Sequence, residues 1–328
     1  MHKQNTVWSK LDYHSRAYAT LTTSRSARIG EALKISAAAK DTRCTSCHAP
    51  LQEVSESAKA ALIPASEGVS CETCHGAAEA WQRSHTRKDY TYVDRVQAGM
   101  RDLKSLYVRA NTCVACHQHV DGDLLKAGHP ELIFELDGQA VSEPRHWREA
   151  KDWSGPQAWL VGQAVALRES SWHLAQDKTA NESAVARWQA LVWLVRTVAA
   201  ENKDWPSREL FKAEPSSANL TAVQQAADAL AKQAAQGWPQ NLSAKLLHKL
   251  AGAHGEFSDN AASRAVMARR AELVVMAVER LSLGLEPASA KLADDLKVLF
   301  GDVQSLPDFS AAQFSKHLEK LHQSLAAK

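Results

Sequence analysis

The cysteines constrain this chain more than any other feature, because all six fall in three copies of one short pattern. They lie between Cys44 and Cys116 of the 328 residues, and the long C-terminal remainder contains none. The copies are Cys44–His48, Cys71–His75 and Cys113–His117, each reading Cys-x-x-Cys-His. A spacing of three residues puts two thiols on one side of a helical turn, with the histidine directly after the second thiol. Such confinement indicates a local chemical task.

This pattern predicts covalent attachment of c-type haem. Two thiols at that spacing can add to the two vinyl groups of one haem, and the adjacent histidine coordinates the iron from the proximal side. Three motifs therefore predict three c-type haems. The predicted attachment sites are Cys44, Cys47, Cys71, Cys74, Cys113 and Cys116, and the predicted proximal iron ligands are His48, His75 and His117.

Other uses of paired cysteines fit the pattern less well. The thiolates from Cys44 to Cys74 could bind one zinc ion, but zinc does not require a histidine after every second cysteine. A thioredoxin-like redox site needs a strand–helix setting and normally one such pair. Disulfide cross-links would not confine themselves to one repeated spacing.

Composition and charge indicate a globular chain of one or two domains. Hydrophobic residues make up 45% of it, and 39 Lys and Arg side chains balance 37 Asp and Glu, so charge gives no reason to expect nucleic acid. The most apolar stretches, 190–200 and 273–285, are shorter than the roughly 20 residues that a membrane-spanning helix needs. We therefore expect no transmembrane segment in this chain.

The haem motifs predict a periplasmic or otherwise extracytoplasmic protein, since haem is attached to them outside the cytoplasmic membrane. The first residues, Met1–Trp8, lack the apolar region of a secretory signal. We accordingly expect that a signal peptide is missing from this sequence.

The sixth iron ligand decides what each haem can do. A second histidine saturates the iron and suits it to electron transfer, whereas an open position binds small molecules. His85 lies ten residues after His75, and His129 lies twelve residues after His117, distances at which a loop or short helix can return to a nearby haem. The candidate distal ligands are His14, His85 and His129, with His119, His146 and His173 in reserve.

Several segments around the motifs resemble the cytochrome c-554-like multihaem c-type cytochromes, over about residues 7 to 175. The resemblance implies stacked haems between which electrons hop, and two histidine ligands on most irons. It implies distal ligands in segments like those around His14 and His129, and more weakly at His85. The matching segments are Trp8 with Asp12–Tyr18, Ser24–Ile29, the three motifs with Gly76, Gly128–Pro130, Phe134–Leu136 and Pro144–Arg148.

The sequence also departs from that family. Relatives often carry a further haem motif upstream of the segment around His14, and this chain begins too late to contain one. Many also carry a motif after a Trp-Pro pair in the C-terminal half, whereas Trp205 and Pro206 here precede Ser207–Leu210. If an upstream haem is missing, His14 is the candidate distal ligand that would most readily lack an iron to bind.

The second half predicts consecutive amphipathic helices from Pro156 onward, because apolar residues recur at alternating spacings of three and four. Short breaks between the helices favour antiparallel neighbours. This part could cover haem edges and dock a redox partner, act as a buttress, or mediate oligomerisation. The stripes run over 160–174, 185–199, 223–234, 267–285 and 314–325, with breaks at 205–206, 237–239, 254–255 and 284–287.

We therefore predict an all-α protein with a three-haem cytochrome domain of short helices and loops over residues 1–150 and an antiparallel helical bundle over 151–328. Its expected function is electron transfer, with other cytochromes or a membrane quinol oxidase as partners and no catalytic residue assigned. The alternative is an enzyme in which one five-coordinate haem acts on a small nitrogen or sulfur compound. A haem-based sensor or scaffold subunit is the third possibility.

Overall fold

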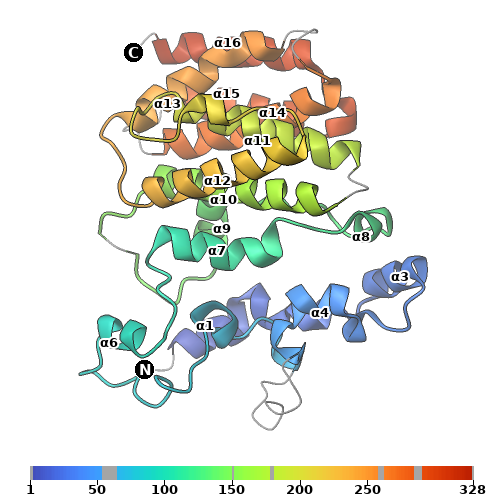
Figure 1. The fold of residues 1–328 in the computed structure, drawn as a ribbon, viewed down its shortest axis with the longest axis vertical. Coiled ribbons are helices and arrows are strands. Elements are labelled where there is room, and N and C mark those ends of the chain that lie inside the picture. The colour runs from blue at the N-terminus through green and yellow to red at the C-terminus, as the bar shows by residue number, and fades with distance from the viewer. Residues whose placement is uncertain are drawn as a thin grey trace. The chain divides into compact units, whose positions relative to one another are not determined.

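A computed structural model describes residues 3–53, 65–149, 151–177, 181–257, 262–283 and 290–326 (Figure 1). Throughout these residues the chain is helical or irregular, with no β-strand, which confirms the predicted all-α class. Within the same residues, no helix combines the length and apolar character needed to cross a bilayer.

The chain divides into two compact units. The first consists of Met1–Ile133 and Gly138–Asp152, and the second of Phe134–Asp137 and Trp153–Lys328. The short helix α9 (Leu136–Ser142) therefore starts in a segment of the second unit and ends in the first.

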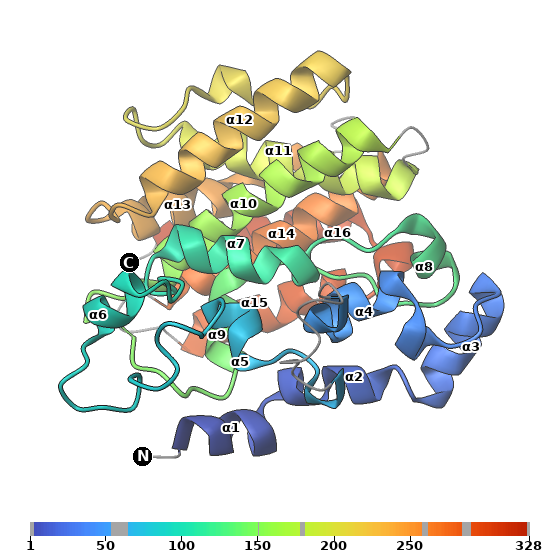
Figure 2. The same cartoon turned by 60° about the horizontal axis from the view of Figure 1, so that its bottom comes forward.

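The first unit is built from short helices joined by turns (Figure 2). Its buried apolar side chains include two small clusters: Leu21 and Ala38 with Cys44, and Ala78 with Trp81 and Met100. Its α-helices besides α9 are α1 (Lys3–Leu11), α2 (Ala17–Thr20), α3 (Ser24–Leu33), α4 (Thr42–His48), α5 (Cys71–His75), α6 (Tyr92–Gln97), α7 (Leu106–His117) and α8 (Gly122–Lys126).

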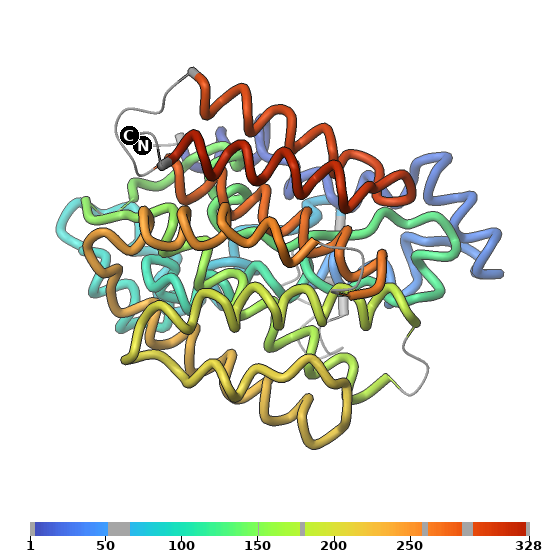
Figure 3. The backbone as a smooth tube through the Cα atoms, turned by 90° about the horizontal axis from the view of Figure 1, so that it is seen from above, coloured from blue at the N-terminus to red at the C-terminus, as the bar shows by residue number. Residues whose placement is uncertain are grey.

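The second unit contains longer helices, each with buried apolar side chains, and Figure 3 shows α15 and α16 running side by side. The predicted apolar stripes fall inside its helices, apart from Leu285, which lies outside the described residues. The helices are α10 (Gly155–Gln176), α11 (Glu182–Ala199), α12 (Ser217–Ala234), α13 (Leu242–Ala251), α14 (Arg264–Ser282), α15 (Ala290–Val303) and α16 (Ala311–Ala326).

Helix α10 lies at the centre of this unit, where it contacts α11, α12 and α14. Its start is fixed by Ser154, whose hydroxyl accepts the backbone N–H of Gln157, and by a proline in the first turn. Every residue from 156 to 167 is buried, which explains why this stretch of the helix carries no charged side chain. Across the core, the indole N–H of Trp188 donates to Ser171 Oγ at 2.8 Å.

The segment Phe134–Asp137 is held in the second unit by close packing and by charge. A Cβ atom at Gly162 would lie 2.8 Å from the Leu136 Cβ, so only glycine lets α10 approach this segment so closely. Arg280 of α14 pairs with Glu135 at 3.5 Å and with Asp137 at 3.4 Å. These contacts explain why four residues of the connecting chain belong to the second unit.

Candidate functional site

Each Cys-x-x-Cys-His motif forms the last turn of a helix, and its histidine is the final helical residue. The motifs end α4 at His48, α5 at His75 and α7 at His117 (Figure 2). In a helical turn, side chains three residues apart lie on one face, so each pair of thiols shares a side of its helix. All six cysteines are free thiols.

Local hydrogen bonds fix where these helices begin and end. Asp41 accepts the Arg43 backbone N–H at 3.0 Å at the start of α4. Helix α5 ends at Gly76, whose φ of 81° suits glycine. Beside it, the Arg101 guanidinium donates to the carbonyl oxygens of Thr73 at 2.8 Å and Cys74 at 2.9 Å, which satisfies carbonyls that a helix end leaves unpaired.

Each motif histidine faces one histidine from elsewhere in the first unit. The ring centroids of His117 and His14 are 5.9 Å apart, and those of His75 and His146 are 6.2 Å apart. For His48 and His129 the separation is 6.4 Å. In all three pairs the ring planes are steeply inclined, between 72° and 85°.

This spacing fits two imidazoles on opposite sides of one iron. An iron–nitrogen bond of about 2 Å, and about 1.1 Å from that nitrogen to the ring centroid, place two such centroids roughly 6 Å apart. The three observed separations lie close to that value. Two thiols and a histidine pair accompany each motif, so the donor set matches three c-type haems with two axial histidines each.

Hydrogen bonds at Nδ1 orient several of these rings and leave Nε2 as the nitrogen that could bind a metal. His14 Nδ1 donates to Asp12 Oδ1 at 3.0 Å. The Nδ1 atoms of His48 and His129 lie 3.0 Å and 2.8 Å from the carbonyl oxygens of Ala17 and Pro130.

The ring of His117 has an amide as its neighbour. The Gln139 side-chain nitrogen lies 3.4 Å from His117 Nδ1, while the Gln139 Oε1 atom is buried without a hydrogen bond to any described residue. Only the hydrogen-bond network distinguishes the nitrogen from the oxygen of an amide. Exchanging the two atoms in Gln139 places its oxygen beside His117 Nδ1, where it accepts the ring N–H.

The surroundings keep four of the paired rings neutral. Burial lowers the pKa of His75 to about 4, with smaller contributions from His146 and Arg101. Burial also lowers the pKa of His48, His117 and His146. A neutral imidazole is the form that offers a lone pair to a metal.

His14 differs, because its hydrogen bond to Asp12 raises its pKa. Burial alone would raise the pKa of Asp12, but hydrogen bonds from His14 lower it below its usual value. Glu143 completes a cluster in which one ligand atom from each residue lies within 4.8 Å of the others. This set of one imidazole and two carboxyl groups is also able to hold a metal ion. Burial raises the pKa of Glu143.

The predicted distal ligands have different surroundings. His14 and His129 each face a motif histidine, and His14 does so across the unit, opposite His117. The partner of His75 is the reserve candidate His146. His85 is exposed, with its ring against Trp81 and its Nδ1 bonded to the Gln82 carbonyl.

The other two reserves also lie apart from the three pairs. His119 is exposed, and its Nε2 pairs with Asp121 at 3.1 Å. His173 belongs to the second unit, where its ring contacts Trp172 with a centroid distance of 4.8 Å.

Thiols of different motifs also come together. The Cys116 thiol donates a hydrogen bond to the Cys47 sulfur, which lowers the pKa of Cys47 to about 6 and raises that of Cys116. Burial raises the pKa of Cys74 to about 12 and that of Cys113 to about 11. Helices α4 and α7 therefore bring the first and third motifs into contact.

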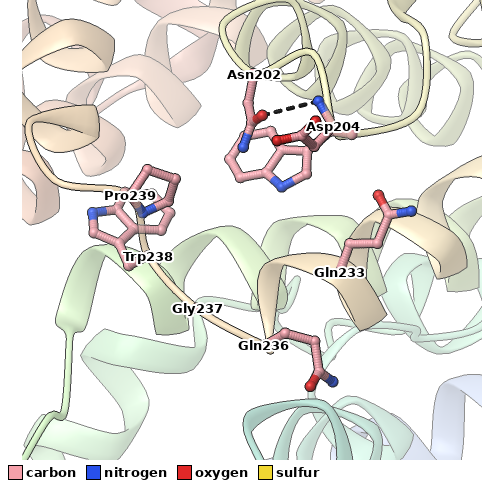
Figure 4. A pocket seen from close by; sticks show the side chains of 8 residues that line it. Asn202, Asp204, Gln233, Gln236, Gly237, Trp238 and Pro239 are labelled. Carbon is pink, nitrogen blue, oxygen red and sulfur yellow. Dashed lines mark hydrogen bonds between the residues drawn. The ribbon is translucent and has the colours of Figure 1, made fainter.

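The second unit has an open pocket of 520 Å³ (Figure 4). Two tryptophans, Trp205 and Trp238, line it with their ring centroids 6.5 Å apart. The lining contains no cysteine or histidine, so it offers no haem ligand. The other lining residues are Asn202, Asp204, Gln233, Gln236, Gly237 and Pro239.

Comparison with known proteins finds a family match for the N-terminal part of this site. Residues 2–76 match the family of cytochrome c554 and c-prime. This segment is cytochrome c-554-like. The match confirms the predicted resemblance and covers the first two motifs of the cytochrome c-554-like segment, while the third motif lies beyond it. No curated protein and no solved structure matches the chain.

Proposed function

We propose that this chain is a multihaem c-type cytochrome that transfers electrons through three covalently bound haems. The observation that carries the proposal is the pairing of every motif histidine with a second histidine at 5.9 to 6.4 Å. The match of residues 2–76 to a cytochrome family supports it independently.

Each motif would anchor one haem through its two cysteines and bind the iron through its histidine. Haem iron held in this way supplies reversible one-electron exchange. The distal histidines proposed are His14, His129 and His146, and they take the position that a small substrate would need. This arrangement favours electron transfer over the alternative, an enzyme with a five-coordinate haem.

The remaining parts of the proposal follow from this chemistry. The first unit is the haem domain, and the second is a helical bundle that supports it or docks a partner. The protein acts outside the cytoplasm, where haem is attached to such motifs, and its partners are other redox proteins.

A pair of substitutions tests the proposal in the haem-loaded protein. Intact-mass measurement should find three covalent haems, with low-spin ferric spectra and no carbon monoxide binding after reduction. His146→Ala should convert one haem to a high-spin form that binds one carbon monoxide per molecule. His85→Ala is the matched control, because this exposed ring faces Trp81, and its spectra should equal those of the wild type.

Two results would contradict the proposal. Carbon monoxide binding by the wild-type protein would favour the enzyme, because one iron would then have an open position. A high-spin haem in His85→Ala, with none in His146→Ala, would overturn the assigned histidine pairs.

A further inference from the structure

The three histidine pairs differ in the charge next to their rings. His14 is bonded through Nδ1 to a carboxylate, that of Asp12, at 3.0 Å. The same Asp12 oxygen accepts the His14 backbone N–H at 2.9 Å, and only 2% of Asp12 is exposed. The bonds found at His48 and His129 are to uncharged carbonyl oxygens instead.

A buried carboxylate beside a ligand histidine opposes reduction of the iron that this histidine binds. Reduction adds an electron to the centre, and a negative charge a few ångströms away disfavours that electron strongly where little water screens it. The hydrogen bond acts in the same direction, because it increases the basicity of the imidazole and so stabilises the ferric state. Glu143 adds a second carboxyl group nearby, since one ligand atom from each of Asp12, His14 and Glu143 lies within 4.8 Å of the others.

The pair of His75 and His146 has charges of both signs nearby: Asp12 also acts electrostatically on His146, while Arg101 supplies a positive charge beside His75. Arg101 bonds the carbonyls of Thr73 and Cys74, and its backbone N–H donates to the His75 carbonyl at 2.8 Å. His75 Nδ1 itself is buried and has no hydrogen-bond acceptor among the described residues. A cation close to the ligand favours the added electron.

We propose that Asp12 is a positioning residue that makes the His14–His117 centre the lowest in reduction potential of the three. The inference rests on the proposed function, since it concerns haems bound by these histidines. Electrons that enter at this centre then pass on to the other two, and its electron donor must be a comparably strong reductant.

The test is potentiometric titration of the holoprotein, followed by visible absorption. Asp12→Asn keeps an oxygen that accepts both His14 bonds and removes the charge. It should raise the lowest of the three potentials by about 59 mV or more. For one electron, this shift is a tenfold change in the equilibrium constant for reduction. The other two steps should move by less.

Asp302→Asn is the matched control. It removes the same charge from another aspartate–histidine pair, in which His317 Nδ1 lies 2.6 Å from Asp302 Oδ2 within the second unit. Each of its three potentials should stay within about 59 mV of the wild-type value.

A second variant covers the case in which Asp12→Asn does not fold. Replacing Cys113 and Cys116 with Ala removes the haem bound by His117, so the lowest-potential step should vanish while two steps remain. Persistence of the lowest step overturns the inference, as does an unshifted lowest potential in a folded Asp12→Asn protein. If the inference fails but the wild-type protein has three low-spin haems, the proposed function stands. If the wild-type protein has fewer than three haems, the proposed function itself is refuted.

Discussion

The two units of this protein use different means to fill their interiors. In the second unit, side chains such as Trp159, Trp188 and Leu160 are completely buried, and the helices around them are long. In the first unit, helices of four to twelve residues surround small apolar clusters, and the cysteines and paired histidines lie among them. Short helices with little apolar contact are marginal on their own.

This difference predicts that the second unit folds on its own side chains, whereas the first depends on the haems proposed above. Three haems bound as proposed would add apolar surface to the first unit. The second unit already has buried apolar side chains in each of its helices. The comparison can be tested at either unit.

The largest effect is expected when haem attachment is prevented. With all six cysteines replaced by Ala, the first unit should lose its compact fold, while the second keeps its helices. Limited proteolysis with mass mapping should then cut throughout residues 3–149 and spare α10 to α14. Equal protection of both units without haem would show that the first has a sufficient core of its own.

The second-largest effect is expected when a large buried side chain is removed from the second unit. Trp188→Ala removes a side chain with no exposed surface and its bond to Ser171, and should reduce the free energy of unfolding by about 3–5 kcal/mol. Denaturant unfolding followed by far-ultraviolet circular dichroism measures this, and the haem content should stay at the wild-type value. The control is Trp172→Ala, since Trp172 is 45% exposed. Similar losses of unfolding free energy in both variants would contradict a stabilising role for the buried side chains of this unit.

The smallest effect concerns an ion pair that stabilises the first unit. Glu149 accepts two bonds from Arg109, at 2.9 and 3.0 Å, and one from Trp147. Burial acts to raise the pKa of Glu149, but these bonds lower it below its usual value. A lowered pKa stabilises the fold above the ordinary glutamate pKa, and this stabilisation disappears as the pH falls through the lowered value.

Glu149→Gln should therefore cost about 1–2 kcal/mol at pH 7 and progressively less in acid. Unfolding midpoints of the holoprotein at pH 7 and pH 3 measure the difference. Asp89→Asn serves as the control, because Asp89 and its partner Arg87 are both mostly exposed, and such pairs contribute little. A difference that grows on acidification would be the wrong sign.

Local sequence patterns were sufficient to predict the elements that depend on near neighbours. Apolar spacing predicts α10, α11, α12, α14 and α16, whereas α13 and α15 fall outside the predicted stripes. The motif spacing predicts thiols on one helical turn. The distal histidines depend on contacts between distant segments. Sequence spacing favours His85 over the reserve candidate His146, because His85 follows His75 closely, yet the fold brings the ring of His146 to His75.

Two further features could not be predicted from the spacing of residues in the sequence. His14 faces His117 although about a hundred residues separate them in the sequence. The four residues Phe134–Asp137 join the second unit through Gly162 and Arg280, which depends on three-dimensional packing and not on composition.

The contact between Cys47 and Cys116 has a consequence for biogenesis. Their hydrogen bond lowers the pKa of the Cys47 thiol, and thiolates are the reactive form in disulfide formation. With an external oxidant, a Cys47–Cys116 disulfide would block the first and third motifs together. Attachment of the proposed haems would therefore have to precede that oxidation or follow reduction of the disulfide.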